Sequence, residues 1–139
     1  MDGFRFDTQT CLYYGRNAVK EHQEVFDDFG KKAVIVTSKF AEGCPNLGLE
    51  DVKEIFEKTK DFHADFIVGI GGGSSLDAAK ALAQLTDGKR KDPEKSAIDI
   101  FFGHGKPYDN YRNMCDIPVL TLPTTAGTGS EVTGGAVLT

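Results

Sequence analysis

The sequence has few cysteines, no long apolar run and no repeated segment. Cys11, Cys44 and Cys115 are far apart and form no C-x-x-C pair, and no signal-like apolar stretch follows Met1. We therefore expect reduced thiols in a cytoplasmic protein. The longest apolar runs have only the length of a strand, which excludes insertion into a membrane. Internal repeats, low-complexity tracts and heptads are also absent, which favours a single folding unit.

The sequence also lacks an excess of basic residues. Its net charge is −5, and the lysines are interleaved with acidic residues. No basic field is present to attract nucleic acid or anionic lipid. Hydrophobic residues make up 40% and charged residues 27% of the chain, which are proportions typical of a globular protein. A chain of 139 residues can bury one core but not two with a cleft between them, so we expect a single domain over residues 1–139.

The hydrophobic pattern alternates between strands and helices. It predicts strands at 11–14, 32–37, 66–70 and 117–122, and helices at 18–29, 49–59 and from 75 to about 85. Asp87-Gly88 is expected to stop the last helix, and the polar segment 89–113 is expected to be a surface loop. Strands that alternate with helices predict an α/β fold, with a Rossmann-like parallel sheet flanked by helices.

A first glycine cluster directly follows the strand predicted at 66–70. Gly71, Gly72 and Gly73 precede Ser74 at the start of a predicted helix. Residues without Cβ let backbone N–H groups approach a phosphate closely, and the helix adds the positive end of its dipole. The cluster fits neither the P-loop nor the usual dinucleotide pattern, because no Gly-Lys-Ser/Thr sequence follows and Ser74 stands where Gly or Ala is expected. The alternative is an ordinary turn in which Ser74 and Asp77 form a helix-capping pair.

A second cluster follows the strand predicted at 117–122. Residues 123–131 read PTTAGTGSE and offer hydroxyl groups on a flexible backbone. The same composition is found in ordinary Thr- and Ser-rich loops. Both clusters stand where open α/β sheets bind ligands, at the carboxyl ends of strands. We therefore expect an anion site in which the two segments meet.

Together, these segments resemble the two signatures of the iron-containing (group III) alcohol dehydrogenases. They are residues 71–80 (GGGSSLDAAK) and 123–133 (PTTAGTGSEVT), and they are supported in the same order by 13–16 (YYGR), 31–38 (KKAVIVTS) and 64–69 (ADFIVG). Butanol and propanediol dehydrogenases are the members that the chain resembles. The resemblance implies a dehydroquinate synthase-like N-terminal domain that binds NAD(P) in an oxidoreductase acting on alcohols or aldehydes.

The resemblance also implies which residues contact the cofactor. The glycine turn would hold the pyrophosphate, and the threonine-rich loop would embrace the cofactor. The implied contacts come from Ser38, Gly71, Gly72, Gly73, Ser74, Thr124, Thr125 and Thr128.

Ser38 decides the expected choice of cofactor. Family members with Asp at this position tend to use NAD, and those with a small residue tend to use NADP. An Asp carboxylate would accept a hydrogen bond from a ribose 2′-hydroxyl but repel a 2′-phosphate, whereas Ser38 could donate to that phosphate beside Lys39. We expect NADP, with NAD as the second candidate.

No metal ligand and no catalytic residue are predicted in this chain. The family binds iron through an Asp and three His in a following helical domain, and none of His22, His63 and His104 stands in a matching context. Their dispersion favours solvated or capping histidines. Asp77 is explained by helix capping, and Glu131 has no visible charged partner.

Two departures from the family pattern limit the expected activity. The chain ends at Thr139, within what resembles the first domain, so we expect the metal-binding helical domain to be absent and the chain alone to be inactive. Only residues 39–48 separate the strand at 32–37 from the next helix, which implies the loss of one α/β layer. Exposed sheet edges would favour a homo-oligomer, and the other possible partner is a separate chain that supplies the metal domain. The alternatives are a non-catalytic nucleotide-binding module and a sugar-phosphate enzyme of dehydroquinate synthase-like fold.

Overall fold

The computed structural model describes residues 10–37, 48–102 and 115–138. These residues form α1 (Ala18–Glu21), α2 (Glu24–Phe29), β1 (Ala33–Thr37), α3 (Leu49–Thr59), η1 (Lys60–Phe62), β2 (Phe66–Gly71), α4 (Gly73–Lys91), α5 (Ala97–Phe102), β3 (Val119–Pro123) and η3 (Ser130–Val132). Ser38 and the connection at 39–47 lie outside this part of the chain, as do Cys44 and His104.

The described strands form one parallel sheet in the order β1-β2-β3. Ala33 of β1 pairs with Phe66 of β2, and Gly71 at the end of β2 pairs with Pro123 at the end of β3. The ends of β2 and β3 therefore lie side by side, as expected for glycine-rich segments that follow neighbouring parallel strands. The predicted α/β class with a parallel sheet and flanking helices is confirmed.

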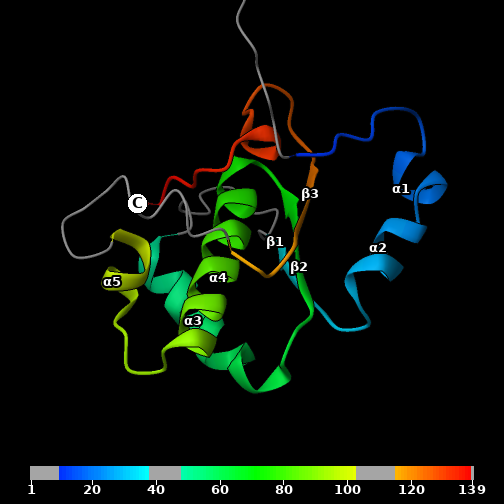
Figure 1. Cartoon of the computed structure of the whole chain (residues 1–139). Helices are drawn as coiled ribbons and strands as arrows, with labels where there is room; N and C mark the ends of the chain where they lie inside the picture. Colours follow the sequence, from blue (N-terminus) through cyan, green and yellow to red (C-terminus); the bar gives the residue numbers. More distant parts are fainter. Residues whose placement is uncertain (1–9, 38–47, 103–114, 139) are drawn as a thin grey trace, which may run out of the picture.

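Helix α4 covers one face of the sheet, with α3 and α5 beside it, whereas α1 and α2 lie on the other side of the strands (Figure 1). The central strand supplies Ile67, which is 1% exposed, and α4 packs Ala78 and Leu82 into the same hydrophobic core. Gly69 allows the close approach of α4, because a Cβ at Gly69 would lie 2.9 Å from the Cβ of Ala79. The start of α4 is thereby fixed relative to the end of β2.

Helix α4 is longer than the sequence pattern indicates. The predicted stop at Asp87-Gly88 is wrong, since the helix begins at Gly73 and continues to Lys91. Gly88 provides space for a neighbouring helix, because a Cβ there would lie 2.7 Å from Cγ2 of Ile100 in α5. The glycine therefore serves packing between helices and does not end the helix.

Helix α5 lies within the segment that was expected to be a loop. Ser96 accepts a hydrogen bond from the backbone N–H of Asp99 at 3.1 Å and donates to its carboxylate at 2.6 Å, which satisfies the first turn of the helix. Ile100 belongs to the hydrophobic core and contacts α4 at Gly88. The expectation of an irregular loop is therefore wrong for residues 97–102, because tertiary contact stabilises a helix too short to form alone.

The first described segment also differs from the prediction. Residues 11–14 do not form a strand, and the expected helix at 18–29 is two short helices separated at His22 and Gln23. Tyr14 is 96% exposed, and neither helix contributes a buried residue. A short strand needs a neighbour that takes up its backbone hydrogen bonds. None of the described helices is long and apolar enough to cross a membrane.

Candidate functional site

The turn between β2 and α4 combines two uses of glycine. Gly71 has φ 144°, a conformation that residues with a side chain rarely adopt. Gly72 is the N-cap of α4 in an extended conformation and makes no side-chain capping bond. Gly71 is therefore needed for its conformation, whereas Gly72 leaves the positive end of the α4 dipole without a side chain of its own.

The second glycine-rich segment lies against this turn. The backbone N–H of Thr124 donates to the carbonyl of Gly71 at 2.9 Å. A Cβ on Gly72 would lie 3.4 Å from Oγ1 of Thr125, and a Cβ on Gly73 would lie 3.3 Å from the Cβ of Thr128. Threonine side chains from one segment therefore border the glycine backbone of the other.

The structure thus brings together most of the residues that the resemblance implied as cofactor contacts. Seven of the eight share this site, namely Gly71, Gly72, Gly73, Ser74, Thr124, Thr125 and Thr128, with Ser74 in the first turn of α4. Ser38 cannot be placed, because it lies outside the described residues.

The threonine-rich loop depends on its own glycines for its shape. Gly127 and Gly129 have φ 94° and 69°, and Gly129 is the N-cap of η3. Thr128 donates through Oγ1 to Oε2 of Glu131 at 3.5 Å. Glu131 therefore has a hydrogen-bonding partner within the loop, which sequence reasoning did not identify.

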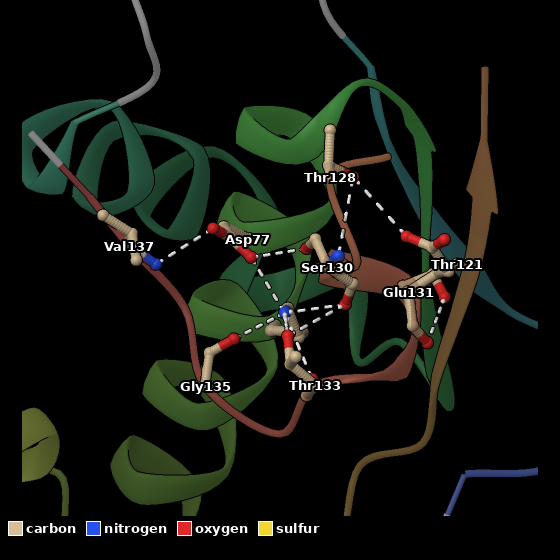
Figure 2. A network of polar contacts seen from close by, with 9 residues as sticks. Asp77, Thr121, Thr128, Ser130, Glu131, Thr133, Gly135 and Val137 are labelled. Carbon is tan, nitrogen blue, oxygen red and sulfur yellow. Dashed lines mark hydrogen bonds and ion pairs between the residues drawn. The ribbon is translucent and has the colours of Figure 1, made fainter. Parts of the chain in front are cut away.

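Asp77 does not cap α4, so the predicted capping pair with Ser74 is wrong. The N-cap is Gly72, and Asp77 lies one turn further along the helix. Its carboxylate pairs with Nζ of Lys80 at 2.8 Å and accepts hydrogen bonds from Oγ of Ser130 at 2.6 Å and from the backbone N–H of Val137 at 3.0 Å (Figure 2). The i,i+3 spacing of the ion pair was visible in the sequence, but its partners more than fifty residues later were not.

The surroundings of Asp77 favour its ionised form. Burial alone would raise the pKa of Asp77, but hydrogen bonds from Lys80, Ser130 and Val137 and the positive charge of Lys80 outweigh it, so that the pKa lies below its usual value. A carboxylate with a lowered pKa stabilises the folded state above the unfolded pKa of about 3.9, and this contribution disappears as the pH falls through the folded pKa.

We therefore expect acid to destabilise the wild-type protein more than the Asp77→Asn variant. Urea unfolding at about pH 5 and at successively lower values down to about pH 2 measures the difference, because the asparagine cannot titrate. The gap in unfolding free energy between the two proteins should narrow as the pH falls. Parallel loss of stability in both proteins would show that the Asp77 interactions do not favour the folded state.

The described residues do not include a set of side chains that could hold a metal ion. No group of three or more His, Cys, Asp or Glu residues is suitably arranged among them. His22 and His63 occupy the C-caps of α1 and η1. The ligand chemistry available in this part of the chain therefore does not fit an iron centre.

The fold and the glycine-rich site define the class of protein as an α/β domain with a parallel sheet whose strand ends carry glycine-rich turns. Residues 40–139 match the family model "iron-containing alcohol dehydrogenase". Because this match covers most of the chain, the chain belongs to the iron-containing alcohol dehydrogenase family. The resemblance inferred from residues 71–80 and 123–133 is thereby confirmed.

Curated relatives and solved structures agree with this assignment. The sulfoacetaldehyde reductase of Bilophila wadsworthia is 30% identical over 91% of this chain and 36% of its own length. The lactaldehyde reductase of Escherichia coli K12 is 34% identical over 91% of this chain and 37% of its length. A crystal structure of an iron-containing alcohol dehydrogenase superposes with a TM-score of 0.74 at 30% identity, covering 95% of this chain and 40% of the other. The present chain thus spans somewhat over a third of the length of these proteins.

Proposed function

We propose that this chain is the part of an alcohol or aldehyde dehydrogenase that binds the nicotinamide dinucleotide. The observation that carries the proposal is the turn at Gly72, where the amino end of α4 carries no side chain and Thr125 faces the glycine backbone. A phosphate placed there would meet backbone N–H groups and the positive end of a nineteen-residue helix. The β2–α4 turn would therefore hold the cofactor pyrophosphate.

The side chains around the turn also suit an anion. Thr125 and Thr128 supply hydroxyl groups from the facing loop, and Ser74 adds another from the helix. The first turn of α4 contains no acidic residue that would repel a phosphate. We assign Gly71, Gly72, Gly73, Ser74, Thr124, Thr125 and Thr128 to cofactor binding.

Two relatives support a dinucleotide as the ligand. The sulfoacetaldehyde reductase of Bifidobacterium kashiwanohense has been solved in complex with NAD+, and it superposes on this chain with a TM-score of 0.70 at 25% identity. The butanol dehydrogenase of Clostridium saccharobutylicum, 29% identical to this chain, is described as NADPH-dependent. The ligand class proposed from the geometry is therefore found among similar proteins.

The proposed role of this chain is to bind and orient the cofactor. When bound, the nicotinamide carries the hydride that passes to or from an alcohol or aldehyde carbon. Because the described residues do not fit an iron centre, the metal ligands would come from further residues or from a separate chain. Among the described strands, β1 and β3 are the outer ones, and pairing of an outer strand with a second copy would also permit a homo-oligomer. The dispersed cysteines, of which Cys11 and Cys115 are free, support a cytoplasmic location.

Titration with NADPH and NADH tests the proposed function directly. We expect at least one of them to bind the purified chain saturably. Calorimetry or nicotinamide fluorescence measures the binding. Competition by ADP, which shares the pyrophosphate, should reduce the signal. If neither reduced cofactor binds at millimolar concentration, the proposed function is wrong.

The preference between the two cofactors depends on Ser38, which we propose reads the 2′ position of the ribose. NADPH is expected to bind more tightly than NADH to the wild-type chain. Ser38→Asp should weaken NADPH through repulsion of the 2′-phosphate and strengthen NADH through a 2′-hydroxyl hydrogen bond, each by about 1–3 kcal/mol. The same titrations measure both changes. Equal shifts for both cofactors, or none, would remove Ser38 from the cofactor site.

A further inference from the structure

The ammonium group of Lys80 lies among oxygen atoms of one short segment. Lys80 Nζ donates to the carbonyl oxygens of Ser130 at 3.0 Å and of Thr133 at 3.2 Å, and it also donates to the carbonyl of Gly135. A further bond of 3.3 Å reaches Oγ1 of Thr133, and Asp77 Oδ1 lies 2.8 Å away (Figure 2). One side chain of α4 thus binds several backbone carbonyl groups that lie fifty or more residues later in the sequence.

Asp77 holds the same segment from the adjacent turn of the helix. Its two carboxylate oxygens accept hydrogen bonds from Ser130 Oγ and from the backbone N–H of Val137. The side chains of Asp77 and Lys80 are each 14% exposed, whereas Val137 is 78% exposed. Residues 133–137 are all exposed, so polar bonds to this pair make up much of what holds them to the helix.

The segment held by this pair continues directly from the candidate cofactor site. Thr128 borders Gly73, and its hydroxyl lies 3.5 Å from the backbone N of Ser130, which is itself buried. Ser130 is therefore bonded both to the ion pair and to the loop that borders the glycine turn. Lys80 lies about two helical turns beyond Gly73. The helix whose amino end forms the phosphate turn thus also fixes the loop facing that turn.

We propose that Asp77 and Lys80 are a positioning pair that holds the loop of Thr125 and Thr128 in its cofactor-binding arrangement before the cofactor arrives. The inference rests on the proposed function, because the loop matters only if a dinucleotide binds there. A loop that is already ordered loses less conformational entropy on binding, so the pair raises cofactor affinity without touching the ligand.

An exposed ion pair on α3 has the same spacing and provides a comparison for Asp77 and Lys80. Lys53 and Glu50 on α3 have the same i,i+3 spacing, with Nζ 2.6 Å from Oε1, but Glu50 is 83% exposed and the pair bonds to no other segment. Exposed pairs of this kind contribute little to stability. Lys53→Ala is therefore a matched control for Lys80→Ala.

The test combines hydrogen exchange without nucleotide and cofactor titration on the same proteins. In Lys80→Ala and in Asp77→Asn, the backbone amide hydrogens of residues 130–137 should exchange at least about tenfold faster than in the wild type. The dissociation constant of NADPH should rise by a similar factor in both variants. Lys53→Ala should change neither quantity. Propylammonium, which replaces the atoms removed from Lys80→Ala, should restore much of the affinity. Lys80→Met fills the same space and should not respond to it.

Failure of the inference can be distinguished from failure of the proposed function. If the wild-type chain binds neither NADPH nor NADH, the proposed function is wrong, and the exchange data still decide whether the pair holds the segment. If exchange is unchanged in Lys80→Ala, Lys80→Met and Asp77→Asn, the pair does not fix the segment. If exchange accelerates but the NADPH affinity stays at the wild-type value, the pair is purely structural and the inference is overturned.

Discussion

Replacing Gly72 with aspartate is expected to abolish dinucleotide binding while leaving the protein folded. The backbone of Gly72 is in an ordinary extended conformation, so an aspartate can adopt it without strain. Its carboxylate would enter the space that we assign to the pyrophosphate and would repel it. Two partly desolvated like charges at close range should weaken binding by about 3 kcal/mol or more, which is at least roughly a hundredfold.

The same substitution should not weaken the fold. Gly72 is the N-cap of α4, where aspartate is a favoured residue and its charge interacts well with the helix dipole. We therefore expect the free energy of unfolding to stay the same or to rise by about 0.3–1 kcal/mol. Loss of binding together with unchanged or increased stability separates a ligand-binding role from a structural one.

Titration of NADPH and thermal unfolding measure these two effects, and two further variants serve as controls. Gln23→Glu adds the same charge at an exposed position distant from Gly72 in the sequence. It should alter neither the affinity for NADPH nor the thermal stability. Gly72→Ala adds a Cβ that lies 3.4 Å from Oγ1 of Thr125, so it should fold normally and bind more weakly than the wild type. Retention of wild-type affinity in Gly72→Asp would show that the cofactor does not use this turn.

Replacing Leu82 with alanine is expected to cost about 2–5 kcal/mol of stability. Leu82 is 1% exposed and packs in the core between α4 and the sheet with Ile67 and Val36. The substitution removes buried methyl and methylene groups and leaves a cavity that the surrounding helices and strands can fill only in part. Because domains are stable by only about 5–15 kcal/mol, this single change would remove a large fraction of the total.

Urea unfolding of the variant provides the measurement. Leu82→Met, which nearly conserves the volume, should lose less than about 1.5 kcal/mol and serves as the control. Cofactor affinity should fall only as far as the folded population falls, because Leu82 lies away from the glycine turn. A loss for Leu82→Ala below about 1 kcal/mol would contradict the assignment of Leu82 to a tightly packed core.

The sequence alone predicted the central features of this protein because they depend on local patterns. The apolar runs of β1 and β2 predicted parallel strands within one residue of their observed bounds. The expected burial on both faces is found for β2 but is wrong for β1, in which Ile35 is 61% exposed. Helix α3 was predicted at its observed bounds from hydrophobic periodicity. The two glycine-rich segments were expected to meet where neighbouring strands end, and they do. The anion site expected there stays a prediction, whereas the resemblance of these segments identified the family.

The same local patterns were misleading where a residue's role depends on a distant partner. The sequence pattern predicts a helix stop at Gly88, but this glycine makes room for Ile100 of α5. Residues 11–14 have a strand-like composition, yet they form no strand. The position of Asp77 near the start of α4 predicts a helix cap, whereas the N-cap is Gly72. Secondary-structure propensity depends on residues close together in the sequence. Packing and long-range hydrogen bonds depend on contacts between distant segments.

The tertiary structure alone revealed how the two signature segments are held together. Thr124 bonds to Gly71 because β2 and β3 are adjacent and end at the same level of the sheet. Lys80 and Asp77 reach Ser130 because one helix runs from the glycine turn past the threonine-rich loop. Sequence determines which groups are present and which local structure they favour. Only the folding of distant segments onto one another brings these groups within hydrogen-bonding distance, since such bonds require partners within about 3 Å.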